Sequence, residues 1–334
     1  MQPFTYARVS TLKAASAAMS DASPDAPAQF LAGGTTLIDL MKLEVLHPGT
    51  VIDINPLQDT LGKIEAREDG LHLGSLVRMA DAAENPDVMR GYPAISQSLA
   101  LAASAQLRNM ATLGGNVLQR TRCPYFRDVS YSQCNKRNLG SGCAAMDGYN
   151  RMHAVLGVSD DCIAAYPGDF AQALIAFDAR VEIAGRHGDR SMPFARLHRL
   201  PGDRPDLETN IEPGEVITGF FVPAGAWTRR SVVVKVRDRE SYEFAVTSAT
   251  VGLDLQDGNV RSARIALGGV ATVPWRAQQA EVVLAGQRFD TAAMLAAADA
   301  AFRDAQPHHD NAFKIALGKQ TLIRALTQAA AIEL

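Results

Sequence analysis

Hydrophobic and polar positions follow two different periods along the first third of this chain. Apolar residues that recur every three or four positions predict helices, and apolar residues at alternate positions predict strands. In chain order, the predicted elements are a helix over residues 10–20, a strand over 29–32, a helix over 36–43, a strand over 50–54, a hairpin around Asp69-Gly70, and helices over 77–86 and 92–105. The first four elements predict a small α/β unit.

Strands dominate the later part of the chain. The predicted elements there are a helix near 169–178, a hairpin turning at Gly188-Asp189, strands over 216–222, 231–236, 245–255 and 260–267, and helices over 276–285, 290–304 and 312–331. An Asp257-Gly258 turn joins the last two strands. The stretch 201–214 is rich in proline, glycine and charge, which predicts an exposed connector. We expect a separate C-terminal α+β domain from about residue 225.

Composition excludes several classes of protein. The net charge of −3 and the pI near 6.2, without a basic stripe, argue against a nucleic-acid binder. No segment reaches the roughly 18 uninterrupted apolar residues of a membrane helix, so we expect no membrane insertion. The first residues lack a charged region followed by an apolar one, which predicts no export signal on this chain.

All four cysteines, Cys123, Cys134, Cys143 and Cys162, fall within one window of 40 residues. Four thiolates are a full ligand set for a cubane iron–sulfur cluster or for a structural zinc ion. Three alternatives to a cluster stay open. The first is a zinc ion, although zinc sites usually contain a more closely spaced cysteine pair, and the second is two disulfides, which are typical of short secreted chains. The third is a set of unrelated buried cysteines, which should be scattered over the whole chain. Six basic residues against two acidic ones between 120 and 151 would favour an anionic cluster.

Two glycine-rich turns could bind a phosphate. Residues 31–38, Leu-Ala-Gly-Gly-Thr-Thr-Leu-Ile, lie between a predicted strand and a predicted helix, where backbone amides can approach an anion. Residues 108–116, Arg-Asn-Met-Ala-Thr-Leu-Gly-Gly-Asn, repeat the same ingredients. Neither turn is a Rossmann or Walker motif, and a structural turn that caps a helix is the alternative for each. Together they could hold one long ligand.

These paired motifs, their order and their spacing resemble the FAD-binding medium subunits of the molybdenum hydroxylases, the family of xanthine dehydrogenase, carbon monoxide dehydrogenase and aldehyde oxidoreductases. The resemblance implies an FAD-binding domain of the vanillyl-alcohol-oxidase (PCMH) type over residues 1–224, with α/β subdomains at 1–55 and 56–224. A C-terminal α+β domain of the carbon monoxide dehydrogenase flavoprotein type would follow at 225–334.

The resemblance also implies the residues that contact FAD. Those of the two turns are Ala32, Gly33, Gly34, Thr35, Thr36, Leu37 and Ile38 in the first, and Arg108, Thr112, Gly115 and Asn116 in the second. Asp169 would contact the ribityl or ribose hydroxyls, with helix capping as the alternative. Lys235 matches a lysine near the flavin, with a solvent-facing strand lysine as the alternative. The shifted position of Asp169 predicts an insertion over about residues 118–166.

The insertion itself resembles those in the flavin subunits of 4-hydroxybenzoyl-CoA reductase and, more closely, of a bacterial periplasmic aldehyde oxidoreductase. The similar stretches are residues 119–128, 134–137 and 140–145. The resemblance implies that Cys123, Cys134, Cys143 and Cys162 bind a [4Fe–4S] cluster near the flavin.

The implied function is electron transfer within a heterotrimer. A large molybdenum-cofactor subunit would oxidise an aldehyde, a small [2Fe–2S] subunit would carry the electrons to FAD, and an external acceptor would receive them, so no catalytic residue is assigned to this chain. The alternatives are a free-standing flavoenzyme, the flavin subunit of a 4-hydroxybenzoyl-CoA reductase-like enzyme, and a metal-containing assembly module. The resemblance implies export to the periplasm with a signal-bearing partner, and a cytoplasmic location is the alternative.

Overall fold

The N-terminal part is a three-stranded parallel sheet in the order β1-β3-β2, as seen in a computed structural model that describes residues 1–23 and 26–334. Its strands are β1 (Thr5–Arg8), β2 (Ala28–Leu31) and β3 (Thr50–Asp53), and its helices are α1 (Leu12–Ser20) and α2 (Leu37–Lys42). The predicted α/β unit is therefore confirmed. Strand β1 was not predicted, because it is an edge strand whose side chains are mostly exposed and carry no hydrophobic alternation.

A five-stranded antiparallel sheet follows in the order β4-β5-β8-β6-β7. Its strands are β4 (Ile64–Ala66), β5 (Gly70–Gly74), β6 (Arg180–Gly185), β7 (Gly188–Pro193) and β8 (Val216–Pro223). Short helical turns flank it at η1 (Asn55–Leu57), α3 (Gln58–Leu61) and η2 (Phe194–Arg196). The central strand β8 joins segments that lie more than a hundred residues apart, because it pairs with β5 on one side and β6 on the other.

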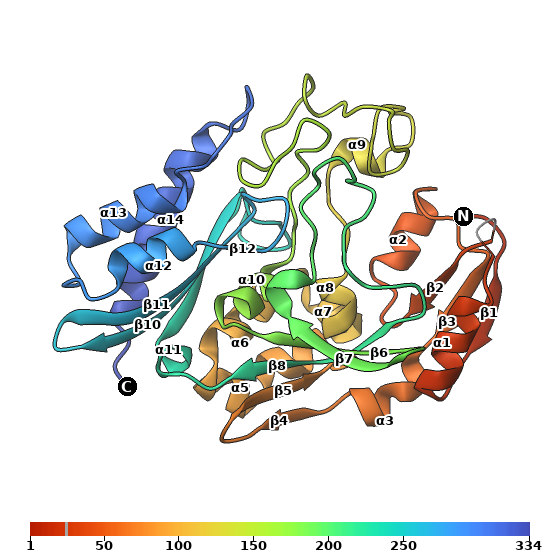
Figure 1. The fold of residues 1–334 in the computed structure, drawn as a ribbon, viewed down its shortest axis with the longest axis horizontal. Coiled ribbons are helices and arrows are strands. Elements are labelled where there is room, and N and C mark those ends of the chain that lie inside the picture. Colours follow the sequence, from red (N-terminus) through yellow and green to blue (C-terminus); the bar gives the residue numbers. More distant parts are fainter. Residues whose placement is uncertain (24–25) are drawn as a thin grey trace.

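The chain between β5 and β6 forms seven helices in the described residues. They are α4 (Met79–Glu84), α5 (Pro86–Gly91), α6 (Pro93–Ala100), α7 (Ala105–Met110), α8 (Leu113–Val117), α9 (Pro124–Arg127) and α10 (Asp169–Ala176). Helix α9 lies apart from the sheet (Figure 1). Every residue of α10 is buried, so this helix forms the centre of the largest hydrophobic core.

The prediction of one helix over 92–105 was wrong. Helix α6 ends at Ala100, Ala103 adopts a left-handed conformation with φ of 49°, and the Ser104 hydroxyl accepts a hydrogen bond from Leu107 N at 3.3 Å to begin α7. The break separates two helices whose sequences share one apolar period, so periodicity alone did not reveal it.

The C-terminal part is a four-stranded antiparallel sheet in the order β12-β11-β10-β9, with helices packed on one face (Figure 1). Its elements are α11 (Ala226–Arg229), β9 (Ser231–Val236), β10 (Thr247–Gln256), β11 (Asn259–Gly268), β12 (Trp275–Arg276), α12 (Gln278–Leu284), α13 (Thr291–Ala301) and α14 (Phe313–Ala330). Asp257 and Gly258 both have positive φ, as the predicted hairpin turn requires.

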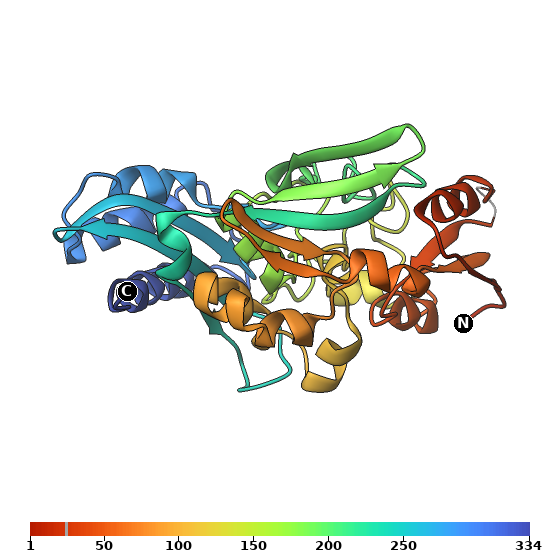
Figure 2. The same ribbon diagram turned by 90° about the horizontal axis from the view of Figure 1, so that it is seen from below.

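The three parts follow one another along the long axis of the molecule (Figure 2). Residues 118–166 contain only one short helix, α9, and their loops lie above the middle sheet, between the N-terminal and C-terminal parts (Figure 1). None of the helices in the described residues is long and apolar enough to cross a membrane. The mixed α+β fold agrees with the predicted class.

Candidate functional site

The two glycine-rich turns meet directly. A Cβ atom on Gly33, in the first turn, would collide with the carbonyl oxygen of Met110, in the second. Arg78 also joins the turns: it donates hydrogen bonds to the Met110 carbonyl and, at 3.2 Å, to Asn55 Oδ1. Asn55 Nδ2 in turn donates to the carbonyl of Ala32 at 3.0 Å. Sequence patterns did not indicate Arg78 or Asn55, because these contacts connect distant positions.

The second turn presents bare backbone to solvent-accessible space. The buried Thr112 hydroxyl accepts a hydrogen bond from Gly115 N at 3.2 Å, and Gly114 N donates to Ser75 O at 2.8 Å. A Cβ atom on Gly115 would meet only the Thr112 hydroxyl, at 3.0 Å, so a larger side chain there would project into the space beside the turn. Glycine keeps this space free for a ligand.

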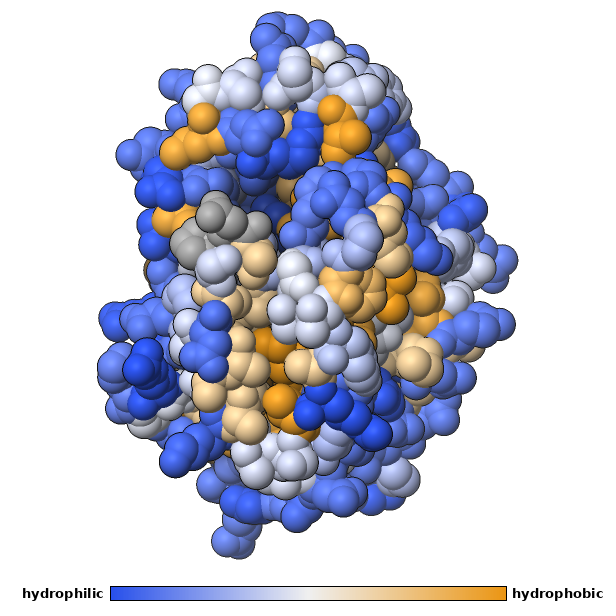
Figure 3. Space-filling model, turned by 90° about the vertical axis from the view of Figure 1, so that its right-hand side faces the viewer, coloured by the Kyte–Doolittle hydropathy of each residue, from blue (hydrophilic) through white to orange (hydrophobic). Residues whose placement is uncertain are grey.

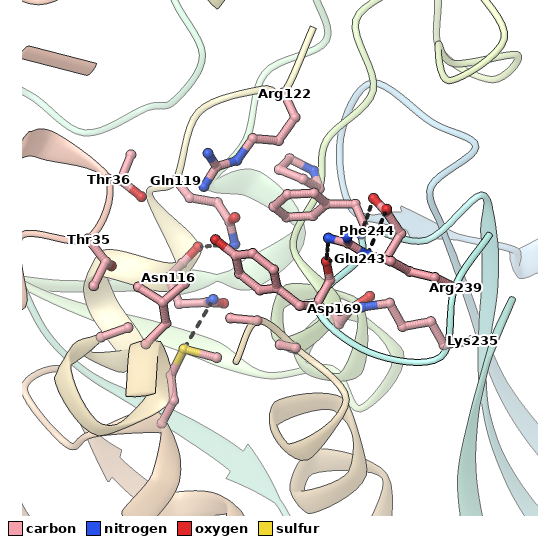
Figure 4. Close-up of a pocket in the computed structure, with 17 residues that line it drawn as sticks. Thr35, Thr36, Asn116, Gln119, Arg122, Asp169, Lys235, Arg239, Glu243 and Phe244 are labelled. Carbon is pink, nitrogen blue, oxygen red and sulfur yellow. Dashed lines mark hydrogen bonds and ion pairs between the residues drawn. The ribbon is translucent and has the colours of Figure 1, made fainter. Parts of the chain in front are cut away.

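Two adjoining cavities share Thr35 and Thr36 in their walls. The first, which we call the turn cavity, follows the glycine turns and is lined by Ala32, Gly33, Gly34, Leu37, Thr112 and Gly115 among others. The second, which we call the junction cavity, lies between the helices of the middle part and β9 (Figure 4). About 1030 and 940 Å³ of space within them is free of atoms, and this space includes solvent at their open mouths.

A buried ion pair lies in the wall of the junction cavity. Lys235 Nζ on β9 lies 2.7 Å from Asp169 Oδ2 and 3.0 Å from the carbonyl of Leu101. Both charged side chains are almost fully buried, so Lys235 is not a solvent-facing strand lysine. Burial raises the pKa of Asp169, and the positive charge of Lys235 opposes this shift. Asp169 is the first residue of α10, not its cap, and Gly168 holds the cap position.

Two buried polar atoms at this cavity have no protein partner. They are Asn116 Oδ1, an acceptor, and Arg122 Nε, a donor, and both residues line the junction cavity. Buried polar atoms are almost always hydrogen-bonded, so this pair fits a cavity that receives a polar ligand. A long ligand with a phosphate-bearing middle, such as FAD, fits the two adjoining cavities and the bare glycine backbone between them.

Two of the residues that the resemblance implied lie outside both cavities. Ile38 is partly exposed on α2, and neither cavity includes it. Arg108 donates hydrogen bonds to the carbonyls of Ala102, at 2.8 Å, and Ala103, at 3.4 Å. Arg108 therefore stabilises the break between α6 and α7. The other residues implied for FAD line at least one cavity.

The four cysteines line one small cavity with about 280 Å³ of space not filled by atoms. All four are free thiols, and Cys134 and Cys143 lie opposite each other in an antiparallel bridge. In residues 1–23 and 26–334, no three His, Cys, Asp or Glu side chains converge on the position of a single metal ion. A cubane cluster takes one thiolate at each of four corners, so its ligands stand farther apart than those of one ion.

Burial favours the protonated form of three of these cysteines in the absence of a metal. It raises the pKa of Cys123 to about 12 and that of Cys162 to about 11, and it also raises the pKa of Cys143. A metal site binds thiolates, so metal binding would have to release these protons. The four thiols line one cavity and are free in the structure.

Most basic residues of the insertion form ion pairs with acidic residues elsewhere in the chain, and these pairs attach the insertion to the rest of the molecule. Arg122 and Arg127 pair with Asp39 of α2, at 3.1 and 2.8 Å. Glu208 of the connector pairs with Lys136, at 2.8 Å, and with Arg120. Arg151 pairs with Asp238, at 2.7 Å. These basic residues therefore help to position the insertion. Their expected effect on an anionic cluster stays a prediction.

The junction cavity and the cysteine cavity are lined by consecutive residues of the chain. Arg122 lines the junction cavity, and its neighbour Cys123 lines the cysteine cavity. The Arg122 guanidinium lies 4.9 Å from the centre of the Phe244 ring, which belongs to the same wall (Figure 4). The peptide bond between residues 122 and 123 therefore joins the two sites.

Comparisons with known proteins agree with this geometry. Residues 2–225 match the family model of the FAD binding domain in molybdopterin dehydrogenase, and residues 233–330 match that of the CO dehydrogenase flavoprotein C-terminal domain. The chain is 45% identical to the aldehyde oxidoreductase FAD-binding subunit PaoB of Escherichia coli K12, over 99% of both chains.

More distant relatives share the same fold. The carbon monoxide dehydrogenase medium chain of Hydrogenophaga pseudoflava is 26% identical over 90% of this chain and 89% of that one. A solved structure of carbon monoxide dehydrogenase from the same organism superposes with a TM-score of 0.76, at 27% identity, over 99% of each chain. The matches cover both parts of the molecule, and this chain belongs to the FAD-binding medium subunits of the molybdenum hydroxylases, a family of oxidoreductases.

Proposed function

We propose that this chain is the electron-transfer subunit of a heterotrimeric, molybdenum-dependent aldehyde oxidoreductase, and that it carries FAD and a [4Fe–4S] cluster. One observation carries the proposal: a cavity with unpaired buried polar atoms adjoins, through the Arg122-Cys123 peptide bond, a cavity lined by four free cysteines. The 45% identity to an aldehyde oxidoreductase subunit supports the choice of substrate class.

The two glycine turns would hold the pyrophosphate of FAD. The backbone around Gly34 can approach phosphate oxygens, the exposed Gly115 leaves room for them beside the second turn, and Thr35 and Thr36 line both cavities. Asn116, with its unpaired Oδ1, would accept a hydrogen bond from the cofactor. Bound FAD would supply a centre that accepts electrons one or two at a time.

The ion pair of Lys235 and Asp169 would fix the wall of the junction cavity beside the flavin ring. Two buried opposite charges 2.7 Å apart hold each other's orientation, and they place a fixed dipole next to the cofactor. Arg122, whose Nε has no protein partner, offers a donor from the opposite wall. These groups bind and orient, and no residue of this chain is proposed to act on the aldehyde.

Cys123, Cys134, Cys143 and Cys162 would bind the cluster. Each comes from a different turn of the insertion, and three sets of ion pairs attach that insertion to α2, the connector and the segment after β9. A bound cluster would supply a one-electron centre close to the flavin. The cavity would separate it from bulk water, since Cys134 and Cys162 are buried.

The proposed partners are a large molybdenum-cofactor subunit, a small [2Fe–2S] subunit and an external electron acceptor. A subunit of a stable complex should expose apolar surface that its partners cover. Apolar side chains gather in a broad central area of the face that includes the N-terminal part (Figure 3). Exposed apolar residues of the N-terminal part include Phe4 and Ile38. We also propose that the assembled complex is exported to the periplasm, as the resemblance implied.

The proposal is tested on anaerobically purified protein, both alone and with its partners. We expect one FAD, about four irons and about four sulfides per chain, and aldehyde oxidation only when the partner subunits are present. Stoichiometric zinc, or disulfides among the four cysteines, would contradict the cluster. Robust aldehyde oxidation by this chain alone would instead indicate a free-standing flavoenzyme.

A further inference from the structure

A buried histidine contacts one of the four cysteines. His153 Nε2 lies 3.2 Å from Cys123 Sγ, and only 3% of His153 is exposed. The other ring nitrogen, Nδ1, is buried and has no hydrogen-bond partner. The sulfur is therefore the polar contact of this ring, and a tautomer with its proton on Nε2 could donate to a thiolate at this position.

The C-terminal part holds His153 in place. Lys314 of α14, which is fully buried, donates from Nζ to the carbonyl of His153 at 2.9 Å and to that of Gly269 at 2.7 Å. Asn311 Nδ2 donates to the next carbonyl, that of Ala154, at 3.1 Å. Successive backbone carbonyls are thus fixed by two side chains from one helical region. The imidazole ring has little freedom to turn away from the sulfur.

The contacts of His153 differ from those of a histidine that only fills space in a hydrophobic core. A histidine that only fills space in a core normally satisfies its ring nitrogens with backbone or hydroxyl groups, because an unpaired buried nitrogen is costly. His153 leaves Nδ1 unpaired and directs Nε2 to a thiol. The buried ammonium group of Lys314 also costs free energy, because in the described chain no carboxylate lies within ion-pair distance of it.

We propose that His153 is a positioning residue that donates its Nε2–H to the Cys123 thiolate and raises the reduction potential of the cluster. The inference rests on the proposed [4Fe–4S] cluster. Reduction adds negative charge that is shared with the ligand sulfurs, and a hydrogen bond to a sulfur stabilises that charge, so it favours the reduced state. The step involves no bond cleavage and no proton transfer.

The test compares two variants in the anaerobically purified holo-complex. His153→Leu removes the Nε2–H donor and fills the site with an apolar side chain. His153→Gln keeps an N–H group that can reach the sulfur. The readouts are iron and FAD content and the reduction potential of the cluster, measured by a redox titration followed by electron paramagnetic resonance. His187→Leu, in an exposed hairpin turn, is the matched control.

We expect His153→Leu to keep about four irons per chain and to shift the cluster potential to a more negative value, with a smaller shift in His153→Gln and none in His187→Leu. An unchanged potential in a fully loaded His153→Leu complex would overturn the inference and leave the proposed function intact. Loss of the cluster in both His153 variants would also overturn it, because His153 would then serve only to build the fold. Wild-type protein without iron would overturn the proposed cluster itself.

Discussion

Lys235 and Asp169 form an ion pair across the boundary between β9 and α10, with 2.7 Å between Nζ and Oδ2 and almost no exposure of either side chain. The pair joins the C-terminal sheet to the helix at the centre of the largest core. It also lies in the wall of the junction cavity, so its effects on stability and on cofactor binding are coupled.

Lys235→Met should destabilise the protein and reduce its FAD content. The substitution leaves the buried carboxylate of Asp169 without its partner, which costs about 3–5 kcal/mol in the free energy of unfolding. Lys319→Met is the control, because Lys319 pairs with the exposed Asp299 at 2.8 Å and such pairs contribute roughly 0–1 kcal/mol. Denaturant titrations and flavin absorbance measure both effects. Equal losses in the two variants would show that the buried pair has no special role.

Gly115→Val should yield protein that folds but lacks FAD. The added side chain would occupy the space beside the second turn, where only the Thr112 hydroxyl lies near an added Cβ atom. Gly91→Val, at the end of α5, is the control, since no atom lies within 4 Å of a Cβ placed there. Flavin absorbance after desalting, together with circular dichroism, separates loss of cofactor from loss of fold. Full flavin occupancy in Gly115→Val would refute the pyrophosphate assignment.

Cys143→Ser should lose or degrade the cluster and leave FAD in place. The cysteine cavity would lose one of four ligands, while the glycine turns that line the turn cavity precede the insertion. The insertion should then become more sensitive to limited proteolysis, because it has little regular secondary structure. Ser132→Ala, an exposed site in the same segment, should retain about four irons. Unchanged iron content in Cys143→Ser would remove Cys143 from the ligand set.

The contribution of Lys314 to the stability of the protein should increase between about pH 7 and about pH 10. Burial, and to a lesser extent the charge of Arg151, lowers the pKa of Lys314 from 10.5 to about 7. In this range Lys314 is more protonated in the unfolded chain than in the folded chain, so its contribution to the free energy of unfolding rises with pH. Lys314→Met should flatten this rise, and Lys319→Met should preserve it. Parallel pH profiles in Lys314→Met and wild type would contradict the assignment.

Local patterns predicted the elements that local interactions stabilise. The alternation in β10 and β11 and the Asp257-Gly258 turn were confirmed, because side-chain period and turn conformation depend on neighbouring residues. Strand β1 was missed because its side chains are mostly exposed and do not alternate. The break at Ala103 was missed because a left-handed residue did not interrupt the apolar period. The predicted domain limits stay predictions.

The residues of the candidate site also divide into those that a local sequence pattern reveals and those that depend on contacts between distant segments. The glycines of both turns could be predicted, because close backbone approach requires glycine wherever it occurs. The roles of Arg78, Asn55 and His153 could not, since each depends on a contact between segments that only the folded chain brings together. Arg108 illustrates the converse, as a motif residue whose guanidinium binds two backbone carbonyls of its own segment.

The Arg122-Cys123 peptide bond has a consequence for the speed of the proposed electron transfer. The rate of electron tunnelling falls steeply as the distance between two redox centres grows. If the centres lie on parts of a complex that move independently, electron transfer depends on motions that bring them close together. Here consecutive residues, whose Cα atoms are about 3.8 Å apart, line the two cavities. Thermal motion of this segment would carry both linings together, so the exchange of electrons between them should need no gating motion and should slow little in viscous solvent.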